Sequence, residues 1–292
     1  MALFKQQQLG AFAAGTVVPI EAVPDPVFAG RMMGDGIAIE PINGVLSAPC
    51  DGEITQLHSA RHACVLSTPS GARVLLHIGI DTVLLKGEGF HAKVAQGDRV
   101  RAGQSLIEFD MDVLRRNAKP VITILVVENG DEFTISERRQ NGLVAVGGEL
   151  LTLTAAGLAA GTEVVVDRSS EIGSGTSSET ETASGWAVIR HAGGMHARPC
   201  AILANAIKPF DAEVTIALGE RSANARSATA VMGLAIGDGD EVVITAAGRH
   251  AGDALEAAIG ALETVSHAPV ESVAVPVSNT PAGKLAANQF AG

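Results

Sequence analysis

Breaks in hydrophobicity set the strongest limit on what the first half of this chain can fold into. Between Gly15 and Leu153, short apolar segments are interrupted by Gly, Pro, Asn or Asp about every 8–12 residues. Only Asp112–Ala118, which lies before Pro120, has the pattern of a helical turn. This spacing is typical of short antiparallel strands, so we expect an all-β sandwich or barrel over residues 14–153.

The second half has a different period. Residues 154–184 are rich in Gly, Ser, Thr and Glu and cannot bury a core, which predicts a flexible linker. Residues 185–268 mix alternation of period two with helical spacing, which predicts a small α+β open-faced sandwich. The expected strands are 186–191, 213–218 and 241–247, and the expected helices are 198–208 and 254–265.

The ends of the chain have no such period. Residues 1–13 are expected to be a loose lead-in. Residues 269–292 are rich in Pro, Ala and Val and are interpreted as a linker toward a missing C-terminal region. The chain is therefore expected to be a piece of a longer polypeptide.

Composition excludes several classes of protein. The formal net charge is −11 and there is no basic stripe, which argues against a nucleic-acid partner. No apolar run approaches the roughly 18 residues of a membrane span, so no membrane insertion is expected. The cysteines are three in number and far apart, which favours reduced thiols and a cytoplasmic location over a disulfide framework.

A histidine in an apolar run is the first candidate for chemistry. His77 lies within Val74–Ile80 and is followed by Asp81, while the turn at 69–71 folds His62 toward it in a predicted hairpin. Two imidazoles and a carboxylate at one sheet surface can support proton, phosphoryl or metal chemistry. A core histidine bonded to a backbone carbonyl is the plain structural alternative.

These residues resemble a known family. The stretch from His77-Ile78-Gly79-Ile80-Asp81 to Phe90, with Val23–Phe28, Gly34–Ile39, Ala48–Gly52 and Gly97–Asp110 around it, is similar to the glucose-family enzyme IIA domain of the bacterial phosphoenolpyruvate-dependent sugar phosphotransferase system. The resemblance implies a β-sandwich in which His77 carries a phosphoryl group on Nε2 and His62 supports it. It also implies that Phe28 belongs to an apolar rim for docking partners and that Asp81 balances charge.

A second histidine precedes a predicted helix. Pro199 marks the first turn of that helix, so His196 lies at its N-terminus, where free N–H groups and the helix dipole favour an anion. Arg198 adds a guanidinium suited to phosphate. A capping loop with an incidental surface histidine is the alternative.

This region has a resemblance of its own. Met195-His196-Ala197-Arg198-Pro199, with Ala225-Arg226-Ser227 and Gly237–Val242 after it, resembles HPr, the histidine phosphocarrier of the same system. The resemblance implies phosphate on Nδ1 of His196 and a docking role for Met195. Together the two likenesses suggest part of an enzyme IIA–HPr–enzyme I fusion that uses no cofactor. Phosphate would pass from enzyme I to His196, then to His77, and then to an enzyme IIB of a glucose or N-acetylglucosamine permease.

Several positions depart from these families or add a question. Ser227 aligns with a serine that an HPr kinase modifies in some relatives, and it is also a predicted helix N-cap. Gly193 and Thr229 replace the Asn and the large apolar residue that are common in HPr, so a loop cap is absent and docking at Thr229 is expected to be weaker. Ala60 and Arg61 stand where enzyme IIA often has Thr-Asn, so a hydroxyl partner for the imidazole is expected to be lost.

Two other functions are consistent with single features. His62 and His77 could ligate a metal in a hydrolase, or bind one adventitiously, but the sequence has no HExxH motif and no cluster of carboxylates. The turn pattern of Gly97–Gln104 is that of biotinyl or lipoyl carriers, but Lys86 does not have the flanking residues that such a carrier needs. A regulatory binding role is compatible with the relay. Oligomeric state and the transfer route, within one chain or between chains, are left open.

Overall fold

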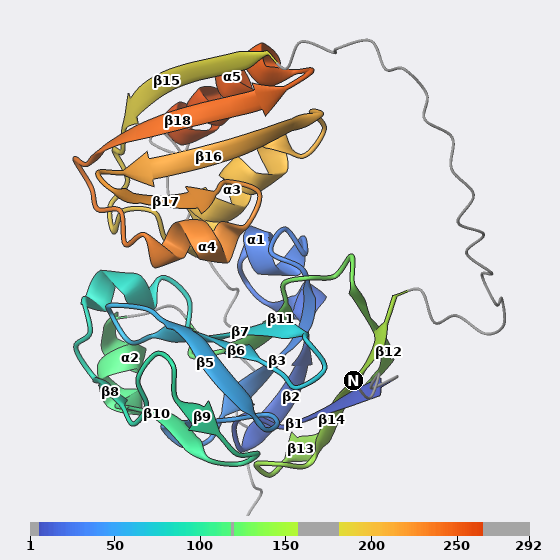
Figure 1. Ribbon diagram of the computed structural model, residues 1–292. Helices are drawn as coiled ribbons and strands as arrows, with labels where there is room; N and C mark the ends of the chain where they lie inside the picture. Colours follow the sequence, from blue (N-terminus) through green and yellow to red (C-terminus); the bar gives the residue numbers. More distant parts are fainter. Residues whose placement is uncertain (1–5, 118–119, 157–180, 265–292) are drawn as a thin grey trace, which may run out of the picture.

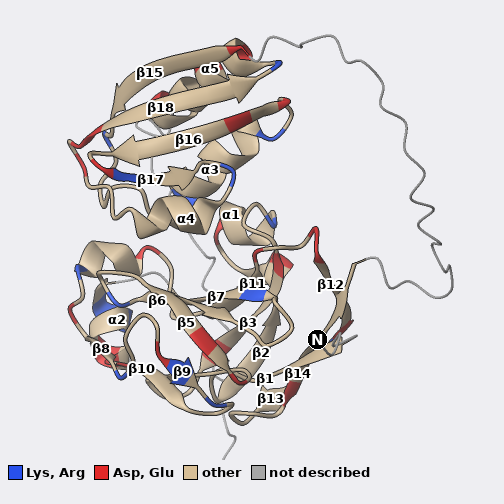
Figure 2. Cartoon of the chain, in the orientation of Figure 1, with Lys and Arg blue, Asp and Glu red and all other residues tan. Residues whose placement is uncertain are grey.

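The computed structural model describes residues 6–117, 120–156 and 181–264, which form two units (Figure 1). The first unit is a β-sandwich and the second is a small sheet covered by helices on one face, so the predicted fold class is confirmed. No helix in the described ranges is long and apolar enough to cross a membrane. In the view of Figure 2, acidic and basic residues are interspersed over both units, with no basic stripe.

The first unit is built from three sheets. An eight-stranded sheet runs β13-β2-β3-β11-β7-β6-β5-β9, and two three-stranded sheets run β4-β10-β8 and β1-β14-β12. The strands are β1 (Gln6–Gly10), β2 (Gly15–Pro19), β3 (Asp35–Pro41), β4 (Val45–Ser47), β5 (Gly52–Leu57), β6 (Ala63–Ser67), β7 (Arg73–Ile78), β8 (Phe90–Ala92), β9 (Arg99–Val100), β10 (Ser105–Phe109), β11 (Thr123–Val127), β12 (Phe133–Arg138), β13 (Leu143–Val144) and β14 (Glu149–Ala155). Apolar residues of these strands are buried where the sheets pack, which places the core between them.

Helical segments in this unit are short. They are η1 (Ile20–Ala22), α1 (Pro26–Ala29), η2 (Thr82–Leu85) and α2 (Met111–Asn117). Helix α2 matches the predicted polar turn. Helix α1 begins where the Asp25 carboxylate accepts hydrogen bonds from the N–H groups of Val27 and Phe28 and where Pro26 occupies the first turn.

The prediction of a loose N-terminal lead-in is wrong for residues 6–13. Strand β1 pairs with β14, with Gln6 opposite Thr154, and Leu9 and Phe12 are almost fully buried. The polar character of residues 6–8 hid this strand because only alternate positions of an edge strand face the core.

The second unit is one antiparallel sheet in the order β15-β18-β16-β17 with helices on one face. Its elements are β15 (Thr182–Val188), α3 (Ala197–Ile207), β16 (Ala212–Leu218), β17 (Arg221–Asn224), α4 (Ala228–Gly233), β18 (Glu241–Gly248) and α5 (Ala251–Thr264). Strand β15 begins inside the predicted linker because its first residue, Thr182, already pairs with Ala247. The rest of that linker, 157–180, and the predicted C-terminal linker from residue 269 lie outside the described residues.

The two units pack against each other. In Figure 1, α1 of the first unit lies against α3 of the second. The side-chain amide of Asn205 on α3 donates to the carbonyl of Met32 at 2.9 Å. Apolar residues from both units join one buried cluster that includes Phe28 and Met195. The elements extend past the domain limits expected from the sequence, because β1 begins at Gln6, β14 runs to Ala155 inside the predicted linker, and β15 begins at Thr182.

Candidate functional site

The hairpin β6–β7 brings His62 and His77 together. Ala63 pairs with His77, and the carbonyl of His62 accepts from the N–H of Ile78 at 2.8 Å. The ring centroids of the two histidines are 4.9 Å apart with planes at 82°. The predicted juxtaposition of these rings is therefore confirmed. Its cause is the tight turn at Thr68–Gly71, which fixes the register of the two strands.

The His77 ring is held in one tautomer. Its Nδ1 lies 2.9 Å from the carbonyl oxygen of Gly79, and since a carbonyl can only accept, Nδ1 carries the proton. Burial lowers the pKa of His77 to about 4, and the Gly79 hydrogen bond opposes that shift. The ring is therefore neutral at pH 7, and its Nε2 has a free lone pair that can act as a nucleophile.

His62 is fully buried and neither of its ring nitrogens has a hydrogen-bond partner among the described residues. Burial lowers the pKa of His62 well below its usual value, and His77 and His58 act in the same direction. These unpartnered nitrogens are consistent with the expectation that the His62 imidazole lacks a hydroxyl partner, because Ala60 stands where that hydroxyl would be. A buried imidazole without partners is costly. The neutral His62 ring thus has one unused N–H donor and one unused acceptor nitrogen beside His77.

Two residues that the sequence analysis did not assign to the site surround these rings. Asp25, the N-cap of α1, is 5% exposed. It lies within Val23–Phe28, one of the segments that carry the family resemblance, but no role was assigned to it from the sequence. Its position before a proline was the signal that could have revealed it. His58 packs on His62 with centroids 4.4 Å apart, and its position four residues before His62 was a weak signal. The predicted Phe28 ring lies 5.3 Å from the His77 ring.

The N-terminus of α3 supplies the second histidine. His196 is the N-cap residue, and its side chain makes no capping hydrogen bond. Burial lowers the pKa of His196 to about 4, Arg198 contributes in the same direction, and Asp81 opposes it. The sequence-based placement of His196 at a helix start is confirmed. Like His77, it is neutral at pH 7.

Arg198 joins the two units. Its Nη2 is 2.6 Å from Oδ2 of Asp25 and 3.5 Å from Oδ1 of Asp81. Its Nε is buried with no hydrogen-bond partner among the described residues. The guanidinium is thus fixed beside both carboxylates while its buried Nε–H donor is unused, which suits an incoming anion.

One small cavity is shared by both histidines. It has a volume of about 10 Å³ and is lined by Asp25, Phe28, His77, Ile80, Asp81, Thr82, Val83, His196, Ala197 and Arg198. A cavity of this size holds about one water molecule. The site therefore places two neutral imidazoles and a guanidinium around a space that excludes bulk water.

The remaining predicted residues lie nearby. Met195 is 2% exposed and belongs to the buried cluster that spans both units. Ser227 is the N-cap of α4, and its Oγ accepts from the N–H of Ala230 at 3.2 Å, as the capping interpretation predicts. Gly193 has φ +87°, and a Cβ there would lie 3.1 Å from Leu84. A glycine therefore lets this loop approach η2 closely.

The two alternative functions find little support. Among the described residues, no group of three or more His, Cys, Asp or Glu side chains could hold a metal ion. Lys86 follows η2 and lies in a connection between β7 and β8 that contains a helical turn. It does not occupy the tip of a two-residue hairpin.

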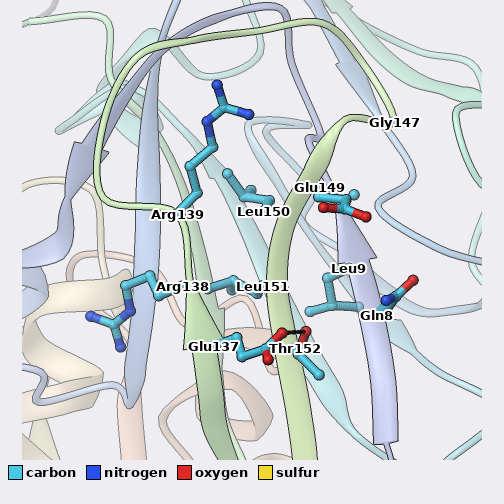
Figure 3. A pocket seen from close by; sticks show the side chains of 11 residues that line it. Gln8, Leu9, Glu137, Arg138, Arg139, Gly147, Glu149, Leu150, Leu151 and Thr152 are labelled. Carbon is cyan, nitrogen blue, oxygen red and sulfur yellow. Dashed lines mark hydrogen bonds between the residues drawn. The ribbon is translucent and has the colours of Figure 1, made fainter.

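A second cavity is unrelated to these histidines. It has a volume of about 380 Å³ and lies over β1, β12 and β14 (Figure 3). Its charged residues include Glu137, which accepts from the Thr152 hydroxyl, and Arg138, which is ion-paired with Asp35. None of the predicted site residues lines it.

Comparison with known proteins gives two family matches. Residues 7–133 match the family of the phosphoenolpyruvate-dependent sugar phosphotransferase system, EIIA 1. Residues 184–264 match the HPr component phosphorylation site of the same system. The two matches cover the sandwich and the small α+β unit in turn.

Individual proteins are similar to parts of this chain. The glucose-specific EIIA component of a Bacillus cereus strain is 48% identical over 126 residues, which is 43% of this chain and 76% of that protein. The solved glucose permease IIA from Mycoplasma capricolum is 32% identical, covers 51% of this chain and 96% of its own, and has a TM-score of 0.49. A phosphocarrier protein HPr from Bacillus anthracis is 31% identical over 28% of this chain and 96% of its own, with a TM-score of 0.27.

Proposed function

The chain belongs to the enzyme IIA family of the phosphoenolpyruvate-dependent sugar phosphotransferase system and carries an HPr domain behind it, and on this basis we propose that it performs two consecutive phosphoryl transfers. His196 receives the phosphoryl group from enzyme I and passes it to His77, which donates it to an enzyme IIB. The observation that carries this proposal is that both histidines line one cavity of a single chain.

The chemistry follows from the tautomers and charges. Nε2 of His77 attacks the phosphorus on Nδ1 of His196, whose ring carries a proton on Nε2 in the phosphorylated state. A P–N bond forms at His77, the P–N bond at His196 breaks, and His196 leaves as a neutral imidazole. The His77 ring becomes positive, and the Gly79 carbonyl that accepts from Nδ1 stabilises that charge. The phosphoryl oxygens accept hydrogen bonds from the Arg198 guanidinium and from the N–H of the neutral His62 ring. Asp81 and Asp25 keep the guanidinium in place.

Transfer within one chain is favoured by the packing of the two domains. The HPr domain is seated on the enzyme IIA domain by an Arg198–Asp25 ion pair, an Asn205–Met32 hydrogen bond and a shared apolar cluster. A tether makes the effective concentration of one domain at the other on the order of millimolar. Met195 and Phe28 contribute to the apolar part of this contact.

The experiment uses enzyme I and labelled phosphoenolpyruvate with wild type, His196→Ala and His77→Ala chains. We expect acid-labile label on both histidines of the wild type, on His196 alone in His77→Ala, and on neither in His196→Ala. Label on His77 of the His196→Ala chain without any other carrier would refute the order of transfer.

A mixing experiment tests the route. Wild type at low concentration is compared with an equimolar mixture of the His196→Ala and His77→Ala chains, in which only transfer between molecules can label His77. A wild-type rate that is independent of protein concentration, together with a mixture rate that rises with it, is expected for transfer within one chain. Equal concentration dependence of the two would refute that route.

Partners and location follow from the same proposal. Enzyme I and an enzyme IIB are the partners that these domains imply, and the enzyme IIA relatives suggest a glucose permease, with N-acetylglucosamine as the alternative sugar. An HPr kinase acting on Ser227 and a fusion to enzyme I in the native polypeptide are further proposals. Labelling of a Ser227→Ala chain by the kinase tests the first of these proposals. The mass of the native protein tests the second. The free thiols of the three buried cysteines suit a cytoplasmic location.

A further inference from the structure

The two domains meet at a second place that the relay does not use. A cavity of about 720 Å³ lies between them, away from both histidines. The enzyme IIA side of its lining includes Arg31, Met32, Arg73, Glu128 and Asp131, and the HPr side includes Asn205, Lys208, Asn224, Arg226, Ser227 and Thr229. Most of these side chains are polar, in contrast to the apolar cluster around Phe28.

Glu128 is the unusual member of this surface. It follows β11, and its N–H donates to the carbonyl of Arg73 at 2.9 Å, so its position is fixed by the sheet. Its side chain is only 8% exposed, and its Oε1 has no hydrogen-bond partner among the described residues. The Arg73 guanidinium is 3.7 Å from Oε2 and is itself 46% exposed. A carboxylate is therefore buried with weak compensation from its own domain.

The HPr domain supplies a neutral donor on the other side of this cavity. Thr229 on α4 is 6% exposed and lines the same cavity as Glu128, where its hydroxyl acts to lower the pKa of Glu128. The same hydroxyl is 3.3 Å from Oγ of Ser227. Burial nevertheless raises the pKa of Glu128 to about 7. Docking thus places a threonine hydroxyl against a carboxylate that would otherwise be covered without a donor.

We propose that Glu128 and Thr229 form a polar specificity contact through which this enzyme IIA domain selects its own HPr domain. The proposal rests on the relay within one chain. An HPr domain with an apolar side chain at this position would cover the carboxylate without offering a donor, and its docking would be disfavoured. A serine or threonine at this position provides a hydroxyl donor for the carboxylate, so docking of such a domain is not disfavoured.

The other charged groups around Glu128 are largely occupied. Arg226 donates to the carbonyls of Lys208, Phe210 and Ala212, and Arg31 is ion-paired with Glu21 and Asp35. The remaining titratable or charged groups that line the cavity are Arg73, Asp131 and Lys208. Arg73 is the nearest of the cations and also acts to lower the pKa of Glu128.

The test is a double-mutant cycle on the full chain. Dyes on Gln140→Cys and Glu220→Cys, both at exposed positions, report docking by energy transfer, while the native cysteines are buried. Thr229→Val keeps the shape of the side chain but removes the hydroxyl, and we expect it to lower the docking constant about tenfold. Thr229→Ser is the matched control and should stay within twofold of wild type.

The second arm removes the carboxylate. In the Glu128→Ala chain, Thr229→Val should change docking less than twofold. Equal effects of Thr229→Val in both backgrounds, or no docking in the wild type, would overturn the proposal. Transfer of label from His196 to His77 is measured separately, so loss of the coupling with intact transfer refutes this contact and leaves the relay standing.

Discussion

Replacing Asp25 by Asn tests whether the ion pair to Arg198 is what aligns the two histidines. Asn is as good an N-cap as Asp, so α1 should remain intact while the charge is lost. The Arg198 contact is short, at 2.6 Å, and Asp25 is 4% exposed on its side chain, whereas Arg198 is 31% exposed. A charge-assisted hydrogen bond contributes about 1.5–3 kcal/mol to stability. Because solvent partly screens the Arg198 charge, we expect the substitution to cost about 2 kcal/mol of docking free energy.

This magnitude predicts a clear kinetic effect. About 2 kcal/mol corresponds to roughly a 30-fold loss in the docked population or in the transfer rate. The assay loads label on His196 with enzyme I and follows its appearance on His77 by rapid quench. Asp35→Asn is the matched control, because Asp35 pairs with Arg31 and Arg138 inside the enzyme IIA domain. A transfer rate within twofold of wild type in a folded Asp25→Asn chain would refute the alignment argument.

Three further predictions concern the same site. His62→Phe fills the buried space without ring nitrogens, so labelling of His77 should fall about 10- to 100-fold in quench assays, and an unchanged rate would argue against a phosphoryl-binding role. The pKa of His77 is depressed to about 4 in the folded chain from the usual 6.5. Its contribution to the free energy of unfolding is therefore complete above pH 6.5 and is lost as pH falls toward 4, by about 2 kcal/mol at pH 5. Urea titrations at several pH values should show that the free energy of unfolding falls more steeply with decreasing pH in wild type than in His77→Asn. Gly193→Asn keeps the positive φ but adds a Cβ 3.1 Å from Leu84, so energy transfer should report docking weakened a few-fold, and no change would mean that the loop adjusts freely.

Local signals were sufficient for much of the site. The hairpin turn before β7 placed His62 beside His77, and the proline in the first turn of α3 placed His196 at a helix start. Both are governed by residues within a few positions of one another, where steric preferences of the backbone decide the structure. The identity of the two domains also followed from motifs contained in single segments.

Contacts between segments far apart in the chain could not be predicted from the sequence. Strand β1 was missed because it pairs with β14, which lies at the other end of the domain's sequence, and residues 6–10 carry no local signal of that partner. The Arg198–Asp25 contact spans 173 positions, so neither residue could be assigned the other without the packed domains. No role was assigned to Glu128 from the sequence.

The division has a physical reason. Short-range sterics and periodicity are visible in the sequence, so it predicts the strand breaks, the turns, the helix starts and the residue types that can carry phosphate. The packing of the two domains is needed to see which carboxylate meets Arg198, why both histidines are neutral, and that a buried Glu128 faces Thr229. Burial and charge pairing arise when surfaces far apart in the chain exclude water together, and no single segment contains that information.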